Sequence, residues 1–194
     1  MQLIRYFDRF PFELRQPPNR DWCIPASIEA VAKYHMPNST VTQGQILHEF
    51  VRRKGLDQIG LKPIQDVLKQ YSEFSWADIR YCEEHQFHGS FNALVSFLEE
   101  CVDENRPAII SVPIPPKNWH MLTVLGYDSE FLRVYDPNPF VWSAYCDAAK
   151  LKIQGALRSR KLTSDTTDAL VISPKTRTTQ NTHSTKVDNE KEGQ

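Results

Sequence analysis

Two β-rich runs, residues 118–128 and 131–139, follow each other with only a short polar connection between them. Strand-forming residues on both sides of such a connection are typical of an antiparallel hairpin. His120 opens the first run and Asp136 closes the second, so a modest stagger of the strands places them side by side at one end of the hairpin. A carboxylate there holds an imidazole in the tautomer that a general base needs. The hairpin therefore restricts the fold and also pairs two groups with acid–base chemistry.

A turn-rich segment, residues 16–22, delivers Cys23 to the start of a predicted helix. One face of that helix is marked by residues at steps of three and four: Ile24, Ile28, Val31, Ala32 and His35. Asp21 or Cys23 itself is expected at the N-cap, and the helix is expected to end near Met36, because the residue before a proline avoids helical angles. A thiol at a helix N-terminus lies near unpaired backbone N–H groups and the positive end of the macrodipole, which favour thiolate. Cys23 is therefore a candidate nucleophile.

Gln16 precedes this cysteine closely in the chain and carries a side-chain amide. That amide and the backbone N–H of Cys23 are two donors suited to the oxyanion of a tetrahedral intermediate, often the largest single contribution to acyl-transfer catalysis. The other interpretation is that Cys23 is a small buried hydrophobic residue and Gln16 a solvated loop residue. With His120 and Asp136 following in order, the chain carries a workable nucleophilic set.

Asn138 is a second candidate for the partner of His120, since Cys-His-Asn sets also work. Asp136 is preferred because it directly ends the predicted strand. Asn138 instead lies inside a Pro-Asn-Pro turn, where asparagine is common for backbone reasons.

These motifs resemble those of papain-like cysteine peptidases of the C39-like, or bacteriocin-processing peptidase-like, family. The resemblance spans roughly residues 10 to 173 and rests on Gln16, the run Cys23–Ser27, the run His120–Asp128 and the pair Asp136-Pro137. It implies an α+β, papain-like cysteine protease fold, with an N-terminal helical lobe packed on an antiparallel β-sheet lobe. It also implies a Cys-His-Asp triad with a glutamine in the oxyanion hole. The chain departs from the family pattern at Ile24, where glycine is usual, and this branched side chain is expected to narrow the cleft.

The rest of the chain supplies further helices and strands. Helices are expected from Thr42 to Gly55, from Lys62 to Tyr71, over residues 90–103 and, on mixed periodicity, over 143–157; strands are expected over 76–81, 106–112 and 168–173. The proline-rich segment 113–118 is expected to be a loop, because proline cannot continue a strand ladder. Residues 1–173 are thus predicted to form one peptidase domain. The tail, residues 174–194, has no aromatic residue and a single aliphatic one, Val187, so it is predicted to be disordered.

Composition excludes several partners and compartments. The formal net charge of −1 gives no bias toward polyanions, so nucleic acid is not expected as a partner. No apolar run approaches the roughly 18 to 20 residues of a membrane span, and charges interrupt the apolar residues at the N-terminus, unlike a secretion signal. The cysteines are widely spaced, without a C-x-x-C pair. A cytoplasmic location, with reduced thiols, no membrane segment and no cofactor, is therefore expected.

Two further features bear on the site. Trp22 and Trp119 each stand immediately before a proposed catalytic residue; they are either core residues or substrate-binding residues that shield the Cys–His pair from water. Cys82, His85 and His88 have spacings that a metal can use, but a structural zinc site usually needs a fourth ligand. A solvated polar loop is the preferred interpretation there.

The mechanism that follows is hydrolytic: Cys23 attacks an amide carbonyl of a peptide or protein substrate, and water resolves the thioester. Acyl transfer to an amine uses the same thioester and remains open as an alternative. So does a catalytically silent peptide-binding module of the same fold, which Ile24 in place of glycine favours slightly. A metal-dependent protein that uses the Cys82–His88 cluster is the least favoured hypothesis.

Overall fold

The computed structural model describes residues 1–17, 22–55, 59–83, 91–114, 118–128, 131–138, 149–152 and 168–176. Its helices are α1 (Cys23–His35), α2 (Gln43–Lys54), α3 (Leu61–Gln70) and α4 (Phe91–Asp103), with short 3-10 helices η1 (Phe7–Arg9) and η3 (Ser72–Phe74). Its strands are β1 (Gln2–Leu3), β2 (Ala77–Cys82), β3 (Ala108–Ile114), β4 (Asn118–Tyr127), β5 (Phe131–Tyr135), β6 (Ala149–Lys152) and β7 (Ala169–Pro174).

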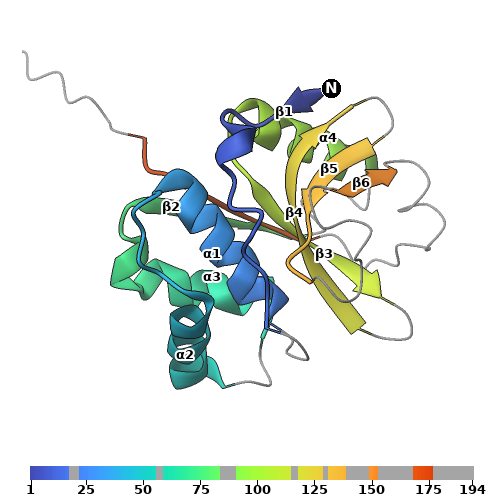
Figure 1. Cartoon of the computed structure of the whole chain (residues 1–194). Coiled ribbons are helices and arrows are strands. Elements are labelled where there is room, and N and C mark those ends of the chain that lie inside the picture. Colours follow the sequence, from blue (N-terminus) through green and yellow to red (C-terminus); the bar gives the residue numbers. More distant parts are fainter. Residues whose placement is uncertain are drawn as a thin grey trace, which may run out of the picture.

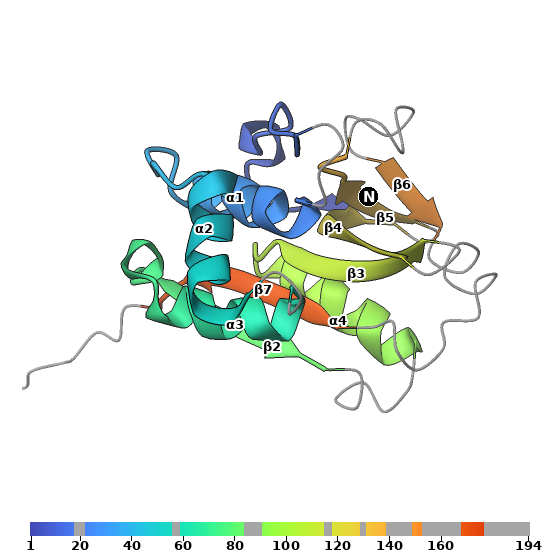
Figure 2. The same cartoon turned by 90° about the horizontal axis from the view of Figure 1, so that it is seen from below.

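The strands form one antiparallel sheet in the order β2-β7-β3-β4-β5-β6. Strand β1 pairs with β4 beyond Ala108, the first residue of β3. Figures 1 and 2 show α1, α2 and α3 gathered at one side of the molecule, β4, β5 and β6 at the other, and β7 running between them. Helix α4 packs against β1, β3 and β4. The expected α+β arrangement, a helical lobe on an antiparallel sheet, is confirmed.

Helix α1 begins and ends close to its predicted limits, apart from its cap. Its first helical residue is Cys23, and its last turn closes with a hydrogen bond from the N–H of Met36 to the carbonyl of Ala32. The N-cap is Trp22, whose side chain makes no capping hydrogen bond. The expectation that Cys23 occupies the cap is therefore wrong by one position, and Asp21 lies outside the described residues.

The expectation that residues 113–118 form only a loop is also wrong. Pro113 continues β3 and pairs with Trp119 of β4. A proline is tolerated in a strand where its missing N–H has no ladder partner to satisfy. That condition holds here, because β7 pairs only with residues 108–110 of β3, so among the described residues no strand lies on the other side of β3 at Pro113.

Three expectations fall wholly or partly outside the described residues. The helix expected over 143–157 is wrong at 149–152, which form β6 and pair with β5; pairing to a formed strand outweighs the weak helical periodicity of this segment. The polar loop after Cys82 includes residues 84–90, and the predicted disordered tail includes residues 177–194, neither of which is described.

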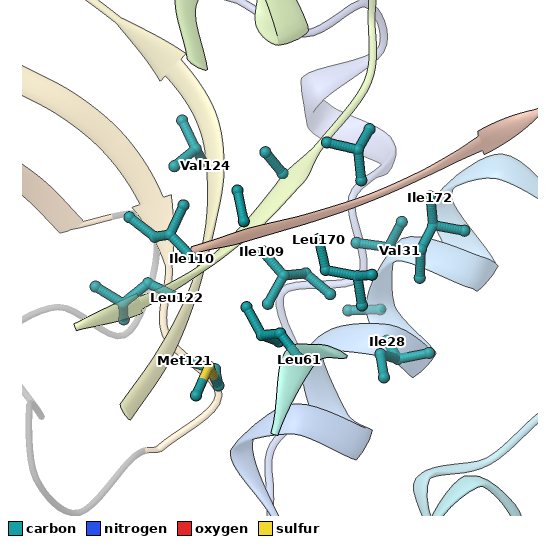
Figure 3. Packing of buried hydrophobic residues seen from close by; sticks show 14 of the residues in the cluster. Ile28, Val31, Leu61, Ile109, Ile110, Met121, Leu122, Val124, Leu170 and Ile172 are labelled. Carbon is teal, nitrogen blue, oxygen red and sulfur yellow. The ribbon is translucent and has the colours of Figure 1, made fainter. Parts of the chain in front are cut away.

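The core joins the helical lobe to the sheet. Figure 3 shows side chains of α1 and β7 lying together: Ile28, Val31, Leu170 and Ile172. All four side chains are 0% exposed. Burial of an aliphatic side chain of this size contributes about 1.5–3 kcal/mol. This contact therefore fixes α1, and with it Cys23, against the sheet.

Gly126 has no room for a side chain. It lies in β4 opposite Leu3 of β1, next to an irregularity in the pairing of β4 with β5. A Cβ atom at this position would lie 2.5 Å from the carbonyl oxygen of Gln2 and 2.5 Å from Cδ2 of Leu3. Glycine therefore permits the close approach of the N-terminal strand to β4.

We expect Gly126→Ala to lower the free energy of unfolding by about 1–3 kcal/mol, because β1 must move away from β4 to admit the methyl group. Gly44→Ala is the matched control: its Cβ would meet nothing closer than Thr42 Oγ1 at 4.0 Å. Alanine is favoured over glycine in a helix by up to about 1 kcal/mol, so this control should be unchanged or more stable. Urea unfolding followed by circular dichroism measures both. A Gly126→Ala protein as stable as wild type would contradict the close packing of β1.

Candidate active site

Cys23 lies at the first residue of α1 and is 9% exposed. Its neighbour Ile24 is 3% exposed and belongs to the hydrophobic core. The side chain of Ile24 therefore helps to anchor the start of the helix. The expectation that Ile24 narrows the cleft is wrong, because a core side chain does not project into an open cleft.

His120 and Asp136 come together through the hairpin. Thr123 of β4 pairs with Tyr135, the last residue of β5, and Asp136 follows directly, so it lies near the part of β4 that carries His120. His120 Nε2 lies 2.7 Å from Asp136 Oδ1, and both residues are 4% exposed. The expected juxtaposition of the imidazole and this carboxylate is present.

Asn138 contributes to the same carboxylate through its backbone. Its N–H donates to Asp136 Oδ1 at 2.8 Å. A carboxylate that accepts a backbone N–H keeps its orientation without a further side chain. Asp136 is thus the group in contact with His120 Nε2, and Asn138 helps to hold that carboxylate in place.

His120 is also hydrogen-bonded to Cys23, and its protonation reflects both partners. Burial alone lowers the pKa of His120, but the hydrogen bonds with Asp136 and Cys23 and the charges of these two groups outweigh burial and raise the pKa to about 9. Since Asp136 occupies Nε2, Nδ1 is the ring nitrogen left for the sulfur of Cys23. At neutral pH an imidazolium therefore lies between a carboxylate and a sulfur atom.

Gln16 reaches this region through its backbone. Its N–H donates to the carbonyl of Pro137 at 2.8 Å, directly after Asp136. Gln16 is 6% exposed, so the alternative in which it is a solvated loop residue is wrong. The segment that carries Gln16 is thus hydrogen-bonded to the chain just after β5, next to the contact between His120 and Asp136.

Trp22 and Trp119 flank the site in different environments. Trp22 is half-buried at the N-cap of α1, directly before Cys23. Trp119 precedes His120 in β4 and is 44% exposed. A core role is thereby excluded for Trp119, and because successive side chains of a strand point to opposite faces, its ring lies on the other face of β4 from His120.

Two residues that the sequence analysis did not single out lie next to the Gln16 segment. The hydroxyl of Tyr135 donates to the carbonyl of Leu14, and the side-chain amide of Gln43 donates to the carbonyl of Arg15. The signal for Tyr135 was its place directly before Asp136. Gln43 gave no signal, because in the sequence it reads only as part of a helix start.

The remaining described histidines and cysteines have other environments. Burial lowers the pKa of His35 to about 4, against the opposing effect of its hydrogen bond to the carbonyl of Ile172, so it is neutral and structural. Burial raises the pKa of Cys82, and raises that of Cys101 to about 12. These two thiols are packing residues of the core.

The described part of the chain offers no group of three or more His, Cys, Asp or Glu side chains placed to hold a metal ion. Within the same ranges, none of the helices combines the length and the apolar character needed to cross a bilayer. His85 and His88, which with Cys82 have spacings that a metal can use, lie outside these ranges.

Comparison with known proteins gives a family and a fold. The model of the Peptidase_C39 like family matches residues 4–154. The structure resembles the peptidase domain of Streptococcus ComA, a bi-functional ABC transporter involved in quorum sensing, at 18% identity and a TM-score of 0.54, over 84% of this chain and 97% of that one. It also resembles a protein described as a C39-like peptidase from Bacillus anthracis, at 14% identity and a TM-score of 0.57, over 91% of this chain and 100% of that one. None of the curated proteins compared with the chain matches it. The expected papain-like fold is confirmed.

We expect the imidazole of His120 to titrate near pH 9 in wild type and well below that in Asp136→Asn. Burial lowers the pKa of this imidazole, and the substitution removes the charge of one of the two groups that raise it. NMR of the ring Cε1–H signals measures both midpoints. His35 is the internal control, with a midpoint near pH 4 in both proteins. A His120 midpoint that does not change on substitution would contradict the assigned pairing.

The same shift has a consequence for stability. A pKa raised from 6.5 to about 9 stabilises the fold fully below pH 6.5, and this stabilisation is lost as the pH rises through 9. The loss of unfolding free energy between pH 6.5 and 9 should therefore be larger in wild type than in Asp136→Asn. Contributions of Cys82 and Cys101 are common to both proteins and cancel in this difference.

Proposed function

The chain belongs to the Peptidase_C39 like family, whose model matches residues 4–154, and we propose that it is a thiol-dependent peptidase or amide hydrolase that uses a Cys23–His120–Asp136 triad. The observation that carries this proposal is the double engagement of His120, which is hydrogen-bonded to Asp136 on one side and to Cys23 on the other. A nucleophile, a base and a group that orients the base are the minimal set for covalent acyl chemistry.

In the proposed reaction, Cys23 and His120 form a thiolate–imidazolium pair, and the sulfur attacks the carbonyl carbon of the substrate. The carbonyl π electrons move to oxygen and form the oxyanion. When the oxyanion collapses, the C–N bond breaks and His120 gives its proton to the leaving amine. Water then attacks the thioester with His120 as base, which releases a carboxylic acid and restores the thiolate–imidazolium pair.

Two donors are assigned to the oxyanion. The first four N–H groups of a helix have no intrahelical acceptor, and the backbone bonds of α1 begin with Ala26 donating to the carbonyl of Trp22, so the N–H of Cys23 is available. The second donor is the side-chain amide of Gln16, which is buried at the end of β5. Removal of one such donor typically slows acylation by about 10²–10³-fold.

We assign Trp119 and Trp22 to substrate binding. Trp119 is 44% exposed and directly precedes His120 in β4, and an exposed aromatic ring at this end of the strand offers apolar area to a peptide side chain. Trp22, half-buried beside Cys23, limits access of water to the sulfur. The substrate class that this surface fits is a peptide or a protein segment.

The alternatives differ in how well the contacts support them. A silent binding module has no need of a histidine engaged by both a carboxylate and a thiol, so this arrangement favours an enzyme. Acyl transfer shares every residue with hydrolysis and differs only in the acceptor. The cytoplasmic location stays a prediction.

We expect iodoacetamide to alkylate Cys23 at pH 6 at least about tenfold faster in wild type than in His120→Ala, because an adjacent imidazolium favours the thiolate, which is the reactive form. Intact mass and peptide mapping measure the rate for each cysteine. Cys82 and Cys101 are buried controls in the same molecule and should react slowly in both proteins. Equal rates at Cys23 in the two proteins would contradict an activated nucleophile.

We expect p-nitrophenyl acetate to give a burst of nitrophenol and an acetyl group on Cys23, with the burst rate reduced by about 10²–10⁴-fold in His120→Ala, the range of general acid–base catalysis. Cys23→Ala is the control and should give neither signal. A peptide library in H₂¹⁸O then tests the acceptor: ¹⁸O in the new C-terminal carboxylates indicates hydrolysis. Acetylation of Cys23 without any peptide cleavage would contradict the assignment as a peptidase.

A further inference from the structure

We propose that Tyr135 and Gln43 are positioning residues that hold the Gln16 amide in line with the reacting carbonyl, an inference that rests on the proposed function. Three consecutive residues of the N-terminal segment each form one hydrogen bond with a residue outside that segment. Tyr135 donates to Leu14 O at 2.5 Å, Gln43 Nε2 donates to Arg15 O at 3.0 Å, and the N–H of Gln16 itself donates to Pro137 O at 2.8 Å.

The bond from Tyr135 ties this segment to the strand that carries Asp136. Tyr135 is fully buried, and its ring packs against Phe10 and Phe12 with centroids 5.1 Å and 6.5 Å away. Burial raises the pKa of its hydroxyl, which therefore remains protonated and able to donate. The position of the Gln16 segment is thus fixed with respect to Asp136.

The bond from Gln43 ties the segment to the helix that carries Cys23. Glu29 of α1 is 4% exposed and its Oε2 accepts the backbone N–H of Gln43 at 2.8 Å. Its other oxygen is bound by Lys33 Nζ at 2.6 Å, so this buried carboxylate is paired. Gln43 therefore joins α1 to the carbonyl of Arg15, and the position of Gln16 is also fixed with respect to the nucleophile.

This double attachment matters because a donor stabilises an oxyanion only when it is held at hydrogen-bond distance from the place where the charge develops. Gln16 lies on a segment without regular secondary structure, so its own backbone does not supply that rigidity. The two cross-links supply it, one from each side of the site.

The test is a double-mutant cycle on the acylation rate with p-nitrophenyl acetate. Tyr135→Phe keeps the packed ring and removes only the hydroxyl, and Gln43→Met keeps the side-chain length and removes the amide. Each is expected to slow acylation by about 3- to 10-fold, the range that one hydrogen bond supports. In a Gln16→Ala background each should change the rate by less than about twofold, because no amide is left to position. The pH profile of Cys23 alkylation should stay as in wild type, since alkylation forms no oxyanion.

Matched controls separate positioning from general loss of packing. Tyr34→Phe removes a hydroxyl that binds the carbonyl of Arg5, and Gln65→Met removes a buried amide that binds the carbonyl of Ile79 at 3.0 Å. Neither touches the Gln16 segment, so both should acylate at the wild-type rate even where urea unfolding shows lost stability.

The possible outcomes distinguish this inference from the proposed function. If p-nitrophenyl acetate does not acylate Cys23 of the wild-type protein, both the proposed function and the positioning role are overturned. If wild type is acylated but Tyr135→Phe slows acylation by the same factor with Gln16 and with Gln16→Ala, the positioning role alone is overturned. A rate in Tyr135→Phe and Gln43→Met equal to wild type, or an alkylation profile that shifts with these substitutions, also overturns that role alone.

Discussion

The buried hydrogen bond between His120 Nε2 and Asp136 Oδ1, 2.7 Å long, is the contact on which the rest of the structure depends. An uncompensated charge at a buried site destabilises a protein by about 3–5 kcal/mol. Both residues are 4% exposed, so loss of one leaves the other buried without this hydrogen bond. Because side chains of a strand alternate between faces, a slip of β4 by one residue would turn His120 away from Asp136. The pairing of these groups thus also requires one register of the hairpin.

That register is supported from three directions. Strand β3 pairs with β4 along residues 108–114, which include the partner of His120, Val112. Strand β1 closes on β4 at Gly126, where only glycine fits. Helix α1 packs against β4 and β7, and Cys23 at its first residue interacts with His120. Each lobe thereby contributes one side chain to a contact that neither lobe contains alone.

The sequence predicted the parts of this arrangement that depend on local patterns. Helical spacing located α1, and two strand-forming runs located the hairpin with His120 and Asp136 at one end. It did not predict that Pro113 continues β3, because that depends on which side of the strand lacks a partner. It did not predict the strand at 149–152 either, since β6 is fixed by pairing with β5. The hydrogen bonds of Tyr135 and Gln43 to the segment before Gln16 join residues distant in the chain, and no local pattern encodes such contacts.

Ile24, the residue after the proposed nucleophile, shows how the chain departs from the family pattern and still places Cys23 at the start of α1. Glycine is required where the backbone adopts a positive φ or where another group approaches closely. Neither condition holds at Ile24, which is helical, and positive φ values among the described residues occur only at Tyr6, Asn105 and Gly55. Its side chain is 3% exposed in the core, and it anchors a helix whose N-cap side chain makes no hydrogen bond. An apolar contact thus holds Cys23 in place where a polar cap is missing, so this departure from the family pattern is compatible with the proposed role of Cys23.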